Sequence, residues 1–244
     1  MTKSGVTGKT AIVTGGSKGY GYGIAEALKS RNAEVWITSR HEDELKRAAE
    51  RLGVNSCKAD ATRGEDWDRL IREVTDRTGT VDILVNNAGG GIKKAPLIEQ
   101  SDQEIERSIS LNLTASILGC RRVVPFMKKR KSGTIINVSS VCAREAWPGW
   151  SVYSAAKVGL SLFSQCLYLE VQDFGVRVTT LIPSWGETEF LAAAGIPQRD
   201  SDTEKRVTKP RELGDLIVQI CELPEHLEIL DLTVLPTVQK IVPL

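Results

Sequence analysis

The fold of this chain is decided by residues 11–21, AIVTGGSKGYG, where a short apolar run leads directly into a glycine-rich turn. The pattern predicts a buried strand at Ala11–Thr14 and a helix that opens after the turn. Glycines in such a turn let backbone amides approach a diphosphate, whose negative charge the N-terminus of the helix favours. A glycine-rich turn alone carries little information. Its position between a strand and a helix indicates a phosphate-binding loop at Thr14–Gly21.

Beyond this loop, short β-rich runs alternate with longer helical patterns. Most of the β-rich runs are near-continuous in Val, Ile and Leu, which is typical of strands that helices cover on both faces. The alternation predicts an α/β fold with a doubly wound, parallel, seven-stranded sheet of the Rossmann type, in a single domain over residues 1–244. The further strands are expected at Glu34–Thr38, Asn55–Ala59, Ile83–Asn86, Gly133–Ser139, Arg177–Pro183 and Ile229–Leu235.

Two helix starts carry the pattern of a capping box, in which a hydroxyl and a carboxylate satisfy backbone amides that have no partner within the helix. They are Thr62-Arg63-Gly64-Glu65 and Ser101-Asp102-Gln103-Glu104. Near the C-terminus, a further helix is indicated by one apolar face, made of Leu213, Leu216, Ile217 and Ile220.

Composition and charge exclude several classes of function. The chain has 244 residues, of which 41% are hydrophobic, and a net charge of +1, so neither nucleic acid nor a membrane is an expected partner. No apolar run approaches the roughly 18 residues of a membrane helix. Residues 1–8 lack the apolar core of a signal peptide, which predicts a cytoplasmic location. The five cysteines lie far apart and the two histidines have no neighbours at metal-ligand spacing, so free thiols and no metal site are expected.

The constellation that points to chemistry is Ser140 followed by Tyr153-Ser154-Ala155-Ala156-Lys157. Tyr153 and Lys157 are four residues apart on a predicted helix, so their side chains share one face and converge. Ser140 follows a predicted strand and is placed to reach the same point. A nearby ammonium, together with the positive charge of an oxidised dinucleotide, lowers the pKa of a tyrosine from its ordinary value of about 10, which would let the phenol exchange protons near neutrality. A helix with an exposed tyrosine and lysine is the alternative interpretation.

These motifs, in this order and spacing, are similar to those of the short-chain dehydrogenase/reductase family, in its shorter single-domain branch. The resemblance rests on TGxxxGxG at Thr14–Gly21, on Asn86-Asn87-Ala88-Gly89, on Ser140 and on YxxxK at Tyr153–Lys157. It extends through most of the chain. It implies an NADPH-dependent carbonyl reductase or, in reverse, an alcohol dehydrogenase, acting on a small-molecule ketone or alcohol.

The resemblance also implies a role for each catalytic residue. Tyr153 donates the proton to the substrate oxygen during reduction, and Ser140 holds that oxygen by a hydrogen bond. Lys157 in addition binds the hydroxyls of the nicotinamide ribose. Asn112 disturbs its helix locally and holds a water that connects to Lys157. An asparagine that is merely packed or solvent-facing is the alternative for Asn112.

The choice of cofactor depends on the end of the second predicted strand. Ser39 stands where NAD-specific relatives usually carry an aspartate that binds the adenosine ribose. Arg40 follows it and Lys18 projects from the glycine-rich loop, so two cations are available to meet a 2′-phosphate. NADP(H) is therefore the preferred cofactor and NAD(H) the alternative, with a pair of solvated cations as the competing interpretation. The cofactor-binding residues that the resemblance implies are Gly15, Ser17, Lys18, Gly19, Tyr20, Ser39, Arg40, Asp60, Ala61, Asn87, Ala88, Gly89, Tyr153, Lys157, Pro183 and Thr188.

The substrate loop is expected at about residues 184–208, a segment that mixes Gly, Pro and charges after a predicted strand. Ser184 stands where relatives commonly have glycine, which restricts the backbone. Tyr20 replaces a usual aliphatic residue of the glycine-rich loop. Trp147 and Trp185 are candidates to bind the substrate beside the catalytic serine and tyrosine, with ordinary packing as the alternative for each. The identity of the substrate stays open.

Two further expectations concern assembly and the main alternative function. Helices around Asn112 and Tyr153 are expected to keep apolar outer faces, and relatives pair such helices across subunits, so a homodimer or homotetramer is implied. The alternative function is a catalytically silent dinucleotide-binding sensor or structural protein. The intact set of Ser140, Tyr153 and Lys157 argues against it, because a protein that only binds needs no proton donor.

Overall fold

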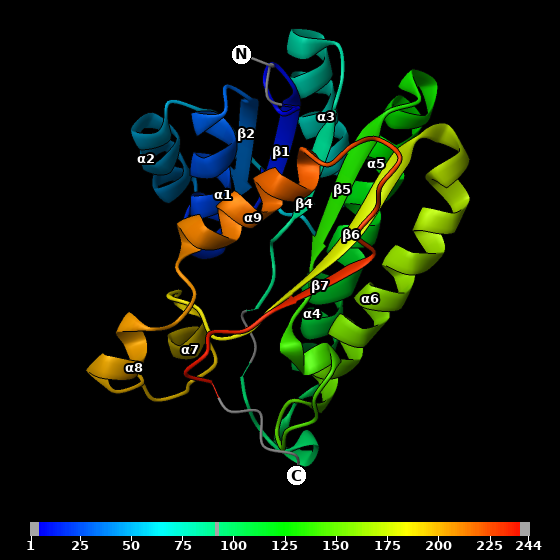
Figure 1. Ribbon diagram of the computed structural model, residues 1–244. Coiled ribbons are helices and arrows are strands. Elements are labelled where there is room, and N and C mark those ends of the chain that lie inside the picture. The colour runs from blue at the N-terminus through cyan, green and yellow to red at the C-terminus, as the bar shows by residue number, and fades with distance from the viewer. Residues whose placement is uncertain (1–4, 91–92, 240–244) are drawn as a thin grey trace.

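Seven parallel strands form one sheet in the computed structural model, which describes residues 5–90 and 93–239. The strand order is β3-β2-β1-β4-β5-β6-β7 (Figure 1). The chain runs outward from β1 to β3, crosses back to pair β4 with the other side of β1, and continues outward to β7. This is the doubly wound arrangement of the Rossmann type, so the predicted α/β single-domain fold is confirmed.

Each predicted strand is present, with ends that differ from the prediction by at most two residues. Strands β1, β4 and β5 are buried along their whole length, because helices cover both faces of the sheet. The strands are β1 (Thr10–Thr14), β2 (Glu34–Ser39), β3 (Asn55–Lys58), β4 (Ile83–Asn86), β5 (Gly133–Val138), β6 (Val176–Pro183) and β7 (Asp231–Val234).

The sheet divides the apolar core into two parts, and helices cover each part. They are α1 (Gly19–Ser30), α2 (Glu42–Leu52), α3 (Gly64–Thr78), α4 (Asp102–Ile109), α5 (Ala115–Arg130), α6 (Ser151–Val171), α7 (Phe190–Ala193), α8 (Ser201–Lys205) and α9 (Pro210–Cys221). On one face α1, α2 and α9 pack around Leu28 and Ile217. On the other face α3, α5 and α6 pack around Trp67 and Met127 (Figure 1).

The two predicted capping boxes have different outcomes. At the start of α4, the Ser101 hydroxyl accepts the Glu104 N–H at 3.3 Å and the Glu104 carboxylate accepts the Ser101 N–H at 2.8 Å, so the prediction is confirmed. At the start of α3 the prediction is wrong, because the N-cap is Arg63. The Asp60 carboxylate accepts hydrogen bonds from both the hydroxyl and the N–H of Thr62, which keeps the threonine away from the helix start.

The predicted substrate loop contains two short helices, α7 and α8, rather than irregular chain alone. A parallel bridge between Gly186 and Thr208 draws the ends of the segment together. The segment follows β6 at the carboxyl edge of the sheet, which is where open α/β sheets bind ligands. In α9, which follows this segment, Leu213, Ile217 and Ile220 are buried as predicted, whereas Leu216 is half-buried.

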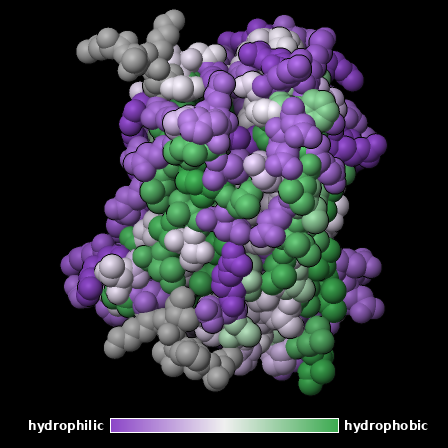
Figure 2. All heavy atoms as spheres, turned by 45° about the vertical axis from the view of Figure 1, so that its right-hand side comes forward, coloured by the Kyte–Doolittle hydropathy of each residue, from purple (hydrophilic) through white to green (hydrophobic). Residues whose placement is uncertain are grey.

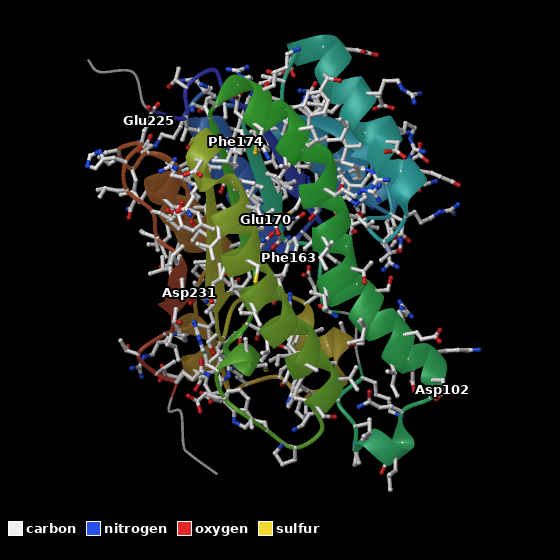
Figure 3. All side chains as sticks on the ribbon, turned by 90° about the vertical axis from the view of Figure 1, so that its right-hand side faces the viewer. Asp102, Phe163, Glu170, Phe174, Glu225 and Asp231 are labelled. Carbon is white, nitrogen blue, oxygen red and sulfur yellow. The ribbon has the colours of Figure 1, made fainter. Side chains whose placement is uncertain are left out.

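The long helix α6 leaves apolar side chains on its outer side. Val158, Leu162 and Leu169 are 48%, 61% and 66% exposed. Figure 2 turns this side of the molecule forward and shows hydrophobic residues gathered along it. Figure 3 looks directly onto α5 and α6, which run side by side, with Phe163 and Glu170 labelled on α6. The predicted apolar outer face is therefore present on α6.

No helix in the described ranges combines the length and the apolar character that a membrane crossing requires. The first four residues, on which the expectation about a signal peptide also depends, lie outside these ranges. All five cysteines are free thiols, and Cys57, Cys120 and Cys221 are buried.

Candidate active site

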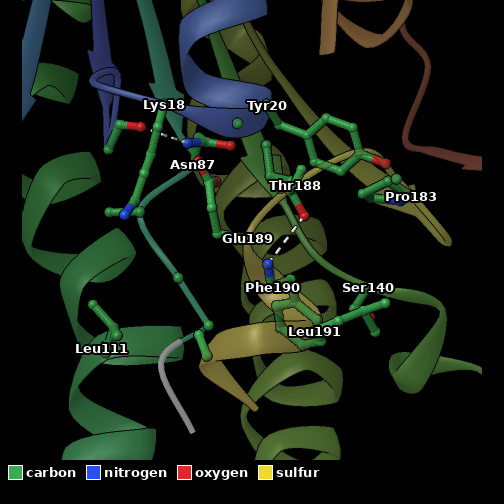
Figure 4. A pocket seen from close by; sticks show the side chains of 18 of the residues that line it. Lys18, Tyr20, Asn87, Leu111, Ser140, Pro183, Thr188, Glu189, Phe190 and Leu191 are labelled. Carbon is green, nitrogen blue, oxygen red and sulfur yellow. Dashed lines mark hydrogen bonds between the residues drawn. The ribbon is translucent and has the colours of Figure 1, made fainter. Parts of the chain in front are cut away.

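A cavity of about 660 Å³ opens at the carboxyl edge of the sheet, between the glycine-rich loop, the ends of β4 and β5 and the segment that follows β6. It includes the point between β1 and β4 where the direction of winding reverses, which is where such folds bind ligands. Figure 4 shows part of its wall. That wall contains all the residues that the sequence assigned to cofactor or substrate: Gly15, Ser17, Lys18, Gly19, Tyr20, Ser39, Arg40, Asp60, Ala61, Asn87, Ala88, Gly89, Ser140, Trp147, Tyr153, Lys157, Pro183, Trp185 and Thr188.

The glycine-rich loop turns through two left-handed residues. Gly15 and Gly19 have φ angles of 65° and 52°, which residues with a Cβ rarely adopt. Helix α1 begins at Gly19, and the side chain of its N-cap residue, Lys18, makes no capping hydrogen bond. The N–H groups of the first turn therefore remain available at the cavity wall. An anion such as a diphosphate fits this helix start.

The motif that follows β4 holds the sheet and the glycine-rich loop together. The Thr14 hydroxyl accepts the N–H groups of both Asn87 and Ala88 at 3.0 Å. The Asn87 side chain donates to the Thr14 carbonyl at 2.9 Å. Figure 4 shows Asn87 beside Lys18. Asn86 reaches the other way and donates to the Asn137 side chain on β5 at 2.8 Å. Asn87 thus holds the start of the glycine-rich loop, while its neighbour Asn86 links β4 to β5.

Tyr153 and Lys157 lie one helical turn apart on the inner face of α6, as their spacing predicts. Both are buried, with 5% and 4% of their surface exposed. The Lys157 Nζ lies 5.8 Å from the centre of the Tyr153 ring and donates a hydrogen bond to the Val138 carbonyl at 2.9 Å. Ser140 follows β5 and caps a 3₁₀ turn, where its Oγ accepts the Cys142 N–H at 3.2 Å.

Without a bound cofactor, the chain's own residues raise the pKa of Tyr153. Burial of the phenol is the main cause, the Cys142 side chain adds to it, and the Ser140 side chain offsets only part of it. Burial also lowers the pKa of Lys157 from 10.5 to about 8. The predicted lowering of the Tyr153 pKa also depends on the positive charge of oxidised nicotinamide, so it stays a prediction.

Asn112 lies behind the cavity wall, in a π-helical turn at Ser110–Thr114 between α4 and α5. The local disturbance of the helix that the resemblance implied is therefore present. The Asn112 Oδ1 accepts the Gly90 N–H at 2.7 Å. A Cβ at Gly89 would lie 3.0 Å from the Asn112 Oδ1 and 3.2 Å from the Lys157 Nζ, so the two side chains converge on this glycine.

At the β2 end of the cavity, the two predicted cations meet a carboxylate that the sequence did not reveal. Lys18 and Arg40 both line the cavity there. Glu44, in the first turn of α2, lies 3.6 Å from the Lys18 Nζ and accepts a hydrogen bond from the Ser17 hydroxyl at 3.1 Å. No motif marks Glu44, because Ser17 lies 27 residues earlier in the chain.

An aromatic cluster surrounds the candidate proton donor. Trp150 stacks on Phe190 with ring centres 5.7 Å apart, and the two rings tilt against Tyr153 with centres at 5.5 and 5.8 Å. Trp147 packs against the edge of this cluster. Phe190 belongs to α7, so the segment after β6 brings an apolar ring beside the tyrosine. Nothing local in the sequence distinguishes Phe190, so no motif predicts its place in the site.

Trp185 contacts an arginine that the sequence did not single out. The Arg199 guanidinium lies 4.7 Å from the centre of the Trp185 ring. Arg199 also pairs with Glu204 at 3.1 Å, and its side chain is only 13% exposed. The Arg199 guanidinium, held by Glu204, therefore lies against the Trp185 ring in the cavity wall.

Tyr20 joins the glycine-rich loop to the segment after β6. Its hydroxyl donates to the Ser184 carbonyl at 3.4 Å, and burial raises its pKa, so it stays a phenol. Figure 4 shows its ring beside Pro183. A Cβ at Gly186 would collide with the hydroxyl. Ser184 is not among the described residues with positive φ, so a side chain in place of the usual glycine leaves this backbone unstrained.

The chain belongs to the short-chain dehydrogenase family, whose profile, described as short chain dehydrogenase, matches residues 9–198. An uncharacterized oxidoreductase of Staphylococcus aureus is 28% identical over 95% of this chain and 98% of its own length. One from Staphylococcus saprophyticus is 30% identical over 93% of this chain and 97% of its own length. The family inferred from the motifs is confirmed, and the chain is an NAD(P)-dependent oxidoreductase.

Solved structures share the fold over almost the whole chain. The closed form of a serine dehydrogenase complexed with NADP⁺ has a TM-score of 0.88 at 25% identity and covers 96% of this chain and 98% of that one. A 3-ketoacyl-(acyl-carrier-protein) reductase from Brucella melitensis complexed with NADH has a TM-score of 0.87 at 27% identity, covering 95% and 98%. Similar chains thus hold either dinucleotide, so any preference of this chain must come from its own residues.

Proposed function

We propose that this protein is an NADP(H)-dependent carbonyl reductase or, in the reverse direction, an alcohol dehydrogenase, with Tyr153 as general acid and base. The observation that carries the proposal is that Ser140, Tyr153 and Lys157 converge on the cavity that the glycine-rich loop also lines. Family membership supplies the oxidoreductase class and small-molecule substrates. The three side chains supply the finer assignment.

The residues present fit a nicotinamide dinucleotide. The uncapped start of α1 suits its diphosphate. At Gly15 a Cβ would lie 3.1 Å from the backbone of Ala88. The glycine-rich loop therefore packs closely against the chain that follows β4, and a side chain at position 15 would crowd this contact. The Ser184 hydroxyl is buried beside the cavity with no hydrogen-bond partner among the described residues. When bound, the dinucleotide supplies the hydride and, once oxidised, a positive charge.

The side chains divide the remaining chemistry. Ser140 holds the substrate oxygen, and Tyr153 gives that oxygen its proton as negative charge develops on it. Because burial alone raises the pKa of Tyr153, the phenol keeps its proton until positive charge is close by. The Lys157 ammonium supplies one such charge and is placed to bind the nicotinamide ribose. Asn112 is proposed to position Lys157 and to hold the water that replenishes the proton.

The proposed preference for NADP(H) depends on Lys18 and Arg40. Both line the β2 end of the cavity, where the carboxylate typical of NAD-specific relatives is replaced by Ser39. A charge-assisted hydrogen bond to a phosphate contributes about 1.5–3 kcal/mol, which is roughly one to two decades of preference per contact.

We further propose that the chain forms a homodimer or homotetramer through the outer face of α6. Leu162 and Leu169 are more than half exposed on that face. Apolar side chains gathered in this way favour burial against a second surface. The family resemblance implies that such helices pair across subunits, so we assign a second copy of the chain to this face.

The alternative is a dinucleotide-binding sensor without turnover. A sensor has no need for the buried pair of Tyr153 and Lys157. Burying an ammonium is unfavourable to folding, so the pair favours an enzyme that uses it. Tight NADPH binding together with failure of every ketone and alcohol tested would favour the sensor.

The decisive experiment is Tyr153→Phe, assayed by NADPH absorbance with a panel of ketones and β-ketoacyl thioesters. Turnover should fall at least about a hundredfold, because proton transfer is lost. The dissociation constant for NADPH should stay within about threefold, because the ring remains. Matched activity in wild type and variant would exclude Tyr153 as the proton donor.

A further inference from the structure

Glu44 brings a negative charge to the part of the cavity where a 2′-phosphate is expected. Its carboxylate lies 3.6 Å from the Lys18 Nζ and accepts the Ser17 hydroxyl at 3.1 Å. The Lys18 and Glu44 side chains remain 50% and 34% exposed. A ligand in the cavity can therefore reach this ion pair and compete with Glu44 for the lysine.

The charges at this end are close to balance. The hollow outside β2 is lined by Lys18, Arg40, His41, Glu42, Asp43, Glu44 and Arg47. Glu42 is engaged on the outer side by Lys46 and Lys58. Glu44 is the acid whose described contacts are with the glycine-rich loop itself. Its charge therefore acts directly on a residue proposed to bind the cofactor.

We propose that Glu44 is a specificity-determining residue that limits the preference of this enzyme for NADP(H). It holds Lys18 in an ion pair, so a 2′-phosphate must displace the carboxylate before it gains the lysine. NAD(H) carries a neutral hydroxyl at that position and leaves the pair intact. This inference rests on the proposed role of Lys18 and Arg40 as the site of the 2′-phosphate.

Glu44→Gln isolates the effect of the charge. The glutamine has the same length and keeps a carbonyl oxygen for the Ser17 hydroxyl, but it does not pair with Lys18. Because an exposed ion pair is weak and a charge-assisted bond to phosphate is stronger, we expect NADP⁺ to bind about three- to tenfold more tightly. Binding of NAD⁺ should change by less than about twofold, since its contacts do not depend on freeing the lysine.

The test is calorimetric titration of the full-length protein with NADP⁺ and with NAD⁺. The matched control is Glu50→Gln, which removes the same charge from an exposed position on the same helix. The ratio of the two dissociation constants should shift toward NADP⁺ in Glu44→Gln and stay unchanged in Glu50→Gln. An unchanged ratio in Glu44→Gln, or equal shifts in both variants, overturns the proposal.

Lys18→Ala separates this inference from the proposed function. If Glu44 acts by holding Lys18, adding Glu44→Gln to Lys18→Ala should give less than about half of the gain in NADP⁺ affinity seen with Lys18 present. An equal gain in both backgrounds overturns the proposed competition. A wild type that prefers NAD⁺ would show the NADP(H) assignment to be wrong, while the shift caused by Glu44→Gln would still decide the role of Glu44.

Discussion

Replacing Lys157 by methionine should stabilise the fold while it abolishes turnover. Burial lowers the pKa of Lys157 from 10.5 to about 8, so folding disfavours the charged form. At 1.36 kcal/mol for each pH unit, this difference corresponds to about 3 kcal/mol of lost stability wherever the lysine is charged in both states. Methionine has a similar length and no charge, so it removes this penalty.

Loss of a hydrogen bond offsets part of the gain. The Lys157 ammonium donates to the Val138 carbonyl at 2.9 Å, and a buried carbonyl left without its donor costs about 1–2 kcal/mol. The expected net gain at neutral pH is therefore about 1–2 kcal/mol. In a domain of this size that raises Tm by roughly 3–6 °C.

The pH dependence of wild-type stability is an independent test that burial of Lys157 destabilises the fold. Between about pH 8 and pH 10.5 the unfolded wild type still binds the proton that the folded protein has released, so its stability rises with pH over this range. Lys157→Met lacks this rise. The advantage of the variant should therefore shrink above pH 8 and reverse at about pH 9–10, where the remaining burial penalty falls below the cost of the lost hydrogen bond.

Urea denaturation followed by circular dichroism at pH 7, 9 and 10, without added nucleotide, measures both effects. Lys129→Met is the matched control, because Lys129 is exposed at the end of α5. The control should leave stability and its pH dependence unchanged. A Lys157→Met variant that is less stable than wild type at pH 7, with a parallel pH profile, would refute the burial penalty.

Three further predictions concern the cofactor, the substrate loop and assembly. Arg40→Ala should lower the ratio of kcat/KM for NADPH to that for NADH about tenfold; an unchanged ratio in cofactor kinetics counts against the NADP(H) assignment. Gly186→Ala should lower the free energy of unfolding by about 1–3 kcal/mol, because its methyl group collides with the Tyr20 hydroxyl. Adding Tyr20→Val should restore stability in thermal melts, and no restoration would mean that the collision is not the cause. Leu162→Glu should yield monomers by analytical ultracentrifugation; a wild type that sediments as a monomer would contradict assembly through α6.

Much of the site could be predicted because its signals are local. Tyr153 and Lys157 are separated by one helical turn, so their convergence follows from helix geometry alone. The strands read as continuous apolar runs because both faces of the sheet are buried. Asn112 stood out because asparagine is a poor residue for the middle of a helix, and a π-helical turn is found there.

The remaining features depend on contacts between distant segments. Glu44 and Phe190 enter the site only after α2 and α7 have packed near β1 and α6. Thr62 fits a capping pattern, but the nearby Asp60 carboxylate takes its hydroxyl instead. The direction of the Tyr153 pKa follows from how deeply the phenol is buried, which a spacing rule does not give.

The contact between Tyr20 and Gly186 also constrains how this enzyme can be altered. The two positions lie far apart in the chain, yet the tyrosine hydroxyl occupies the space that a side chain at 186 would need. A larger residue at 186 is therefore tolerated only after position 20 has become smaller, so the order of substitution matters. Libraries that diversify the substrate loop while leaving Tyr20 unchanged will lose most variants at position 186. Varying the two positions together would open those variants to selection.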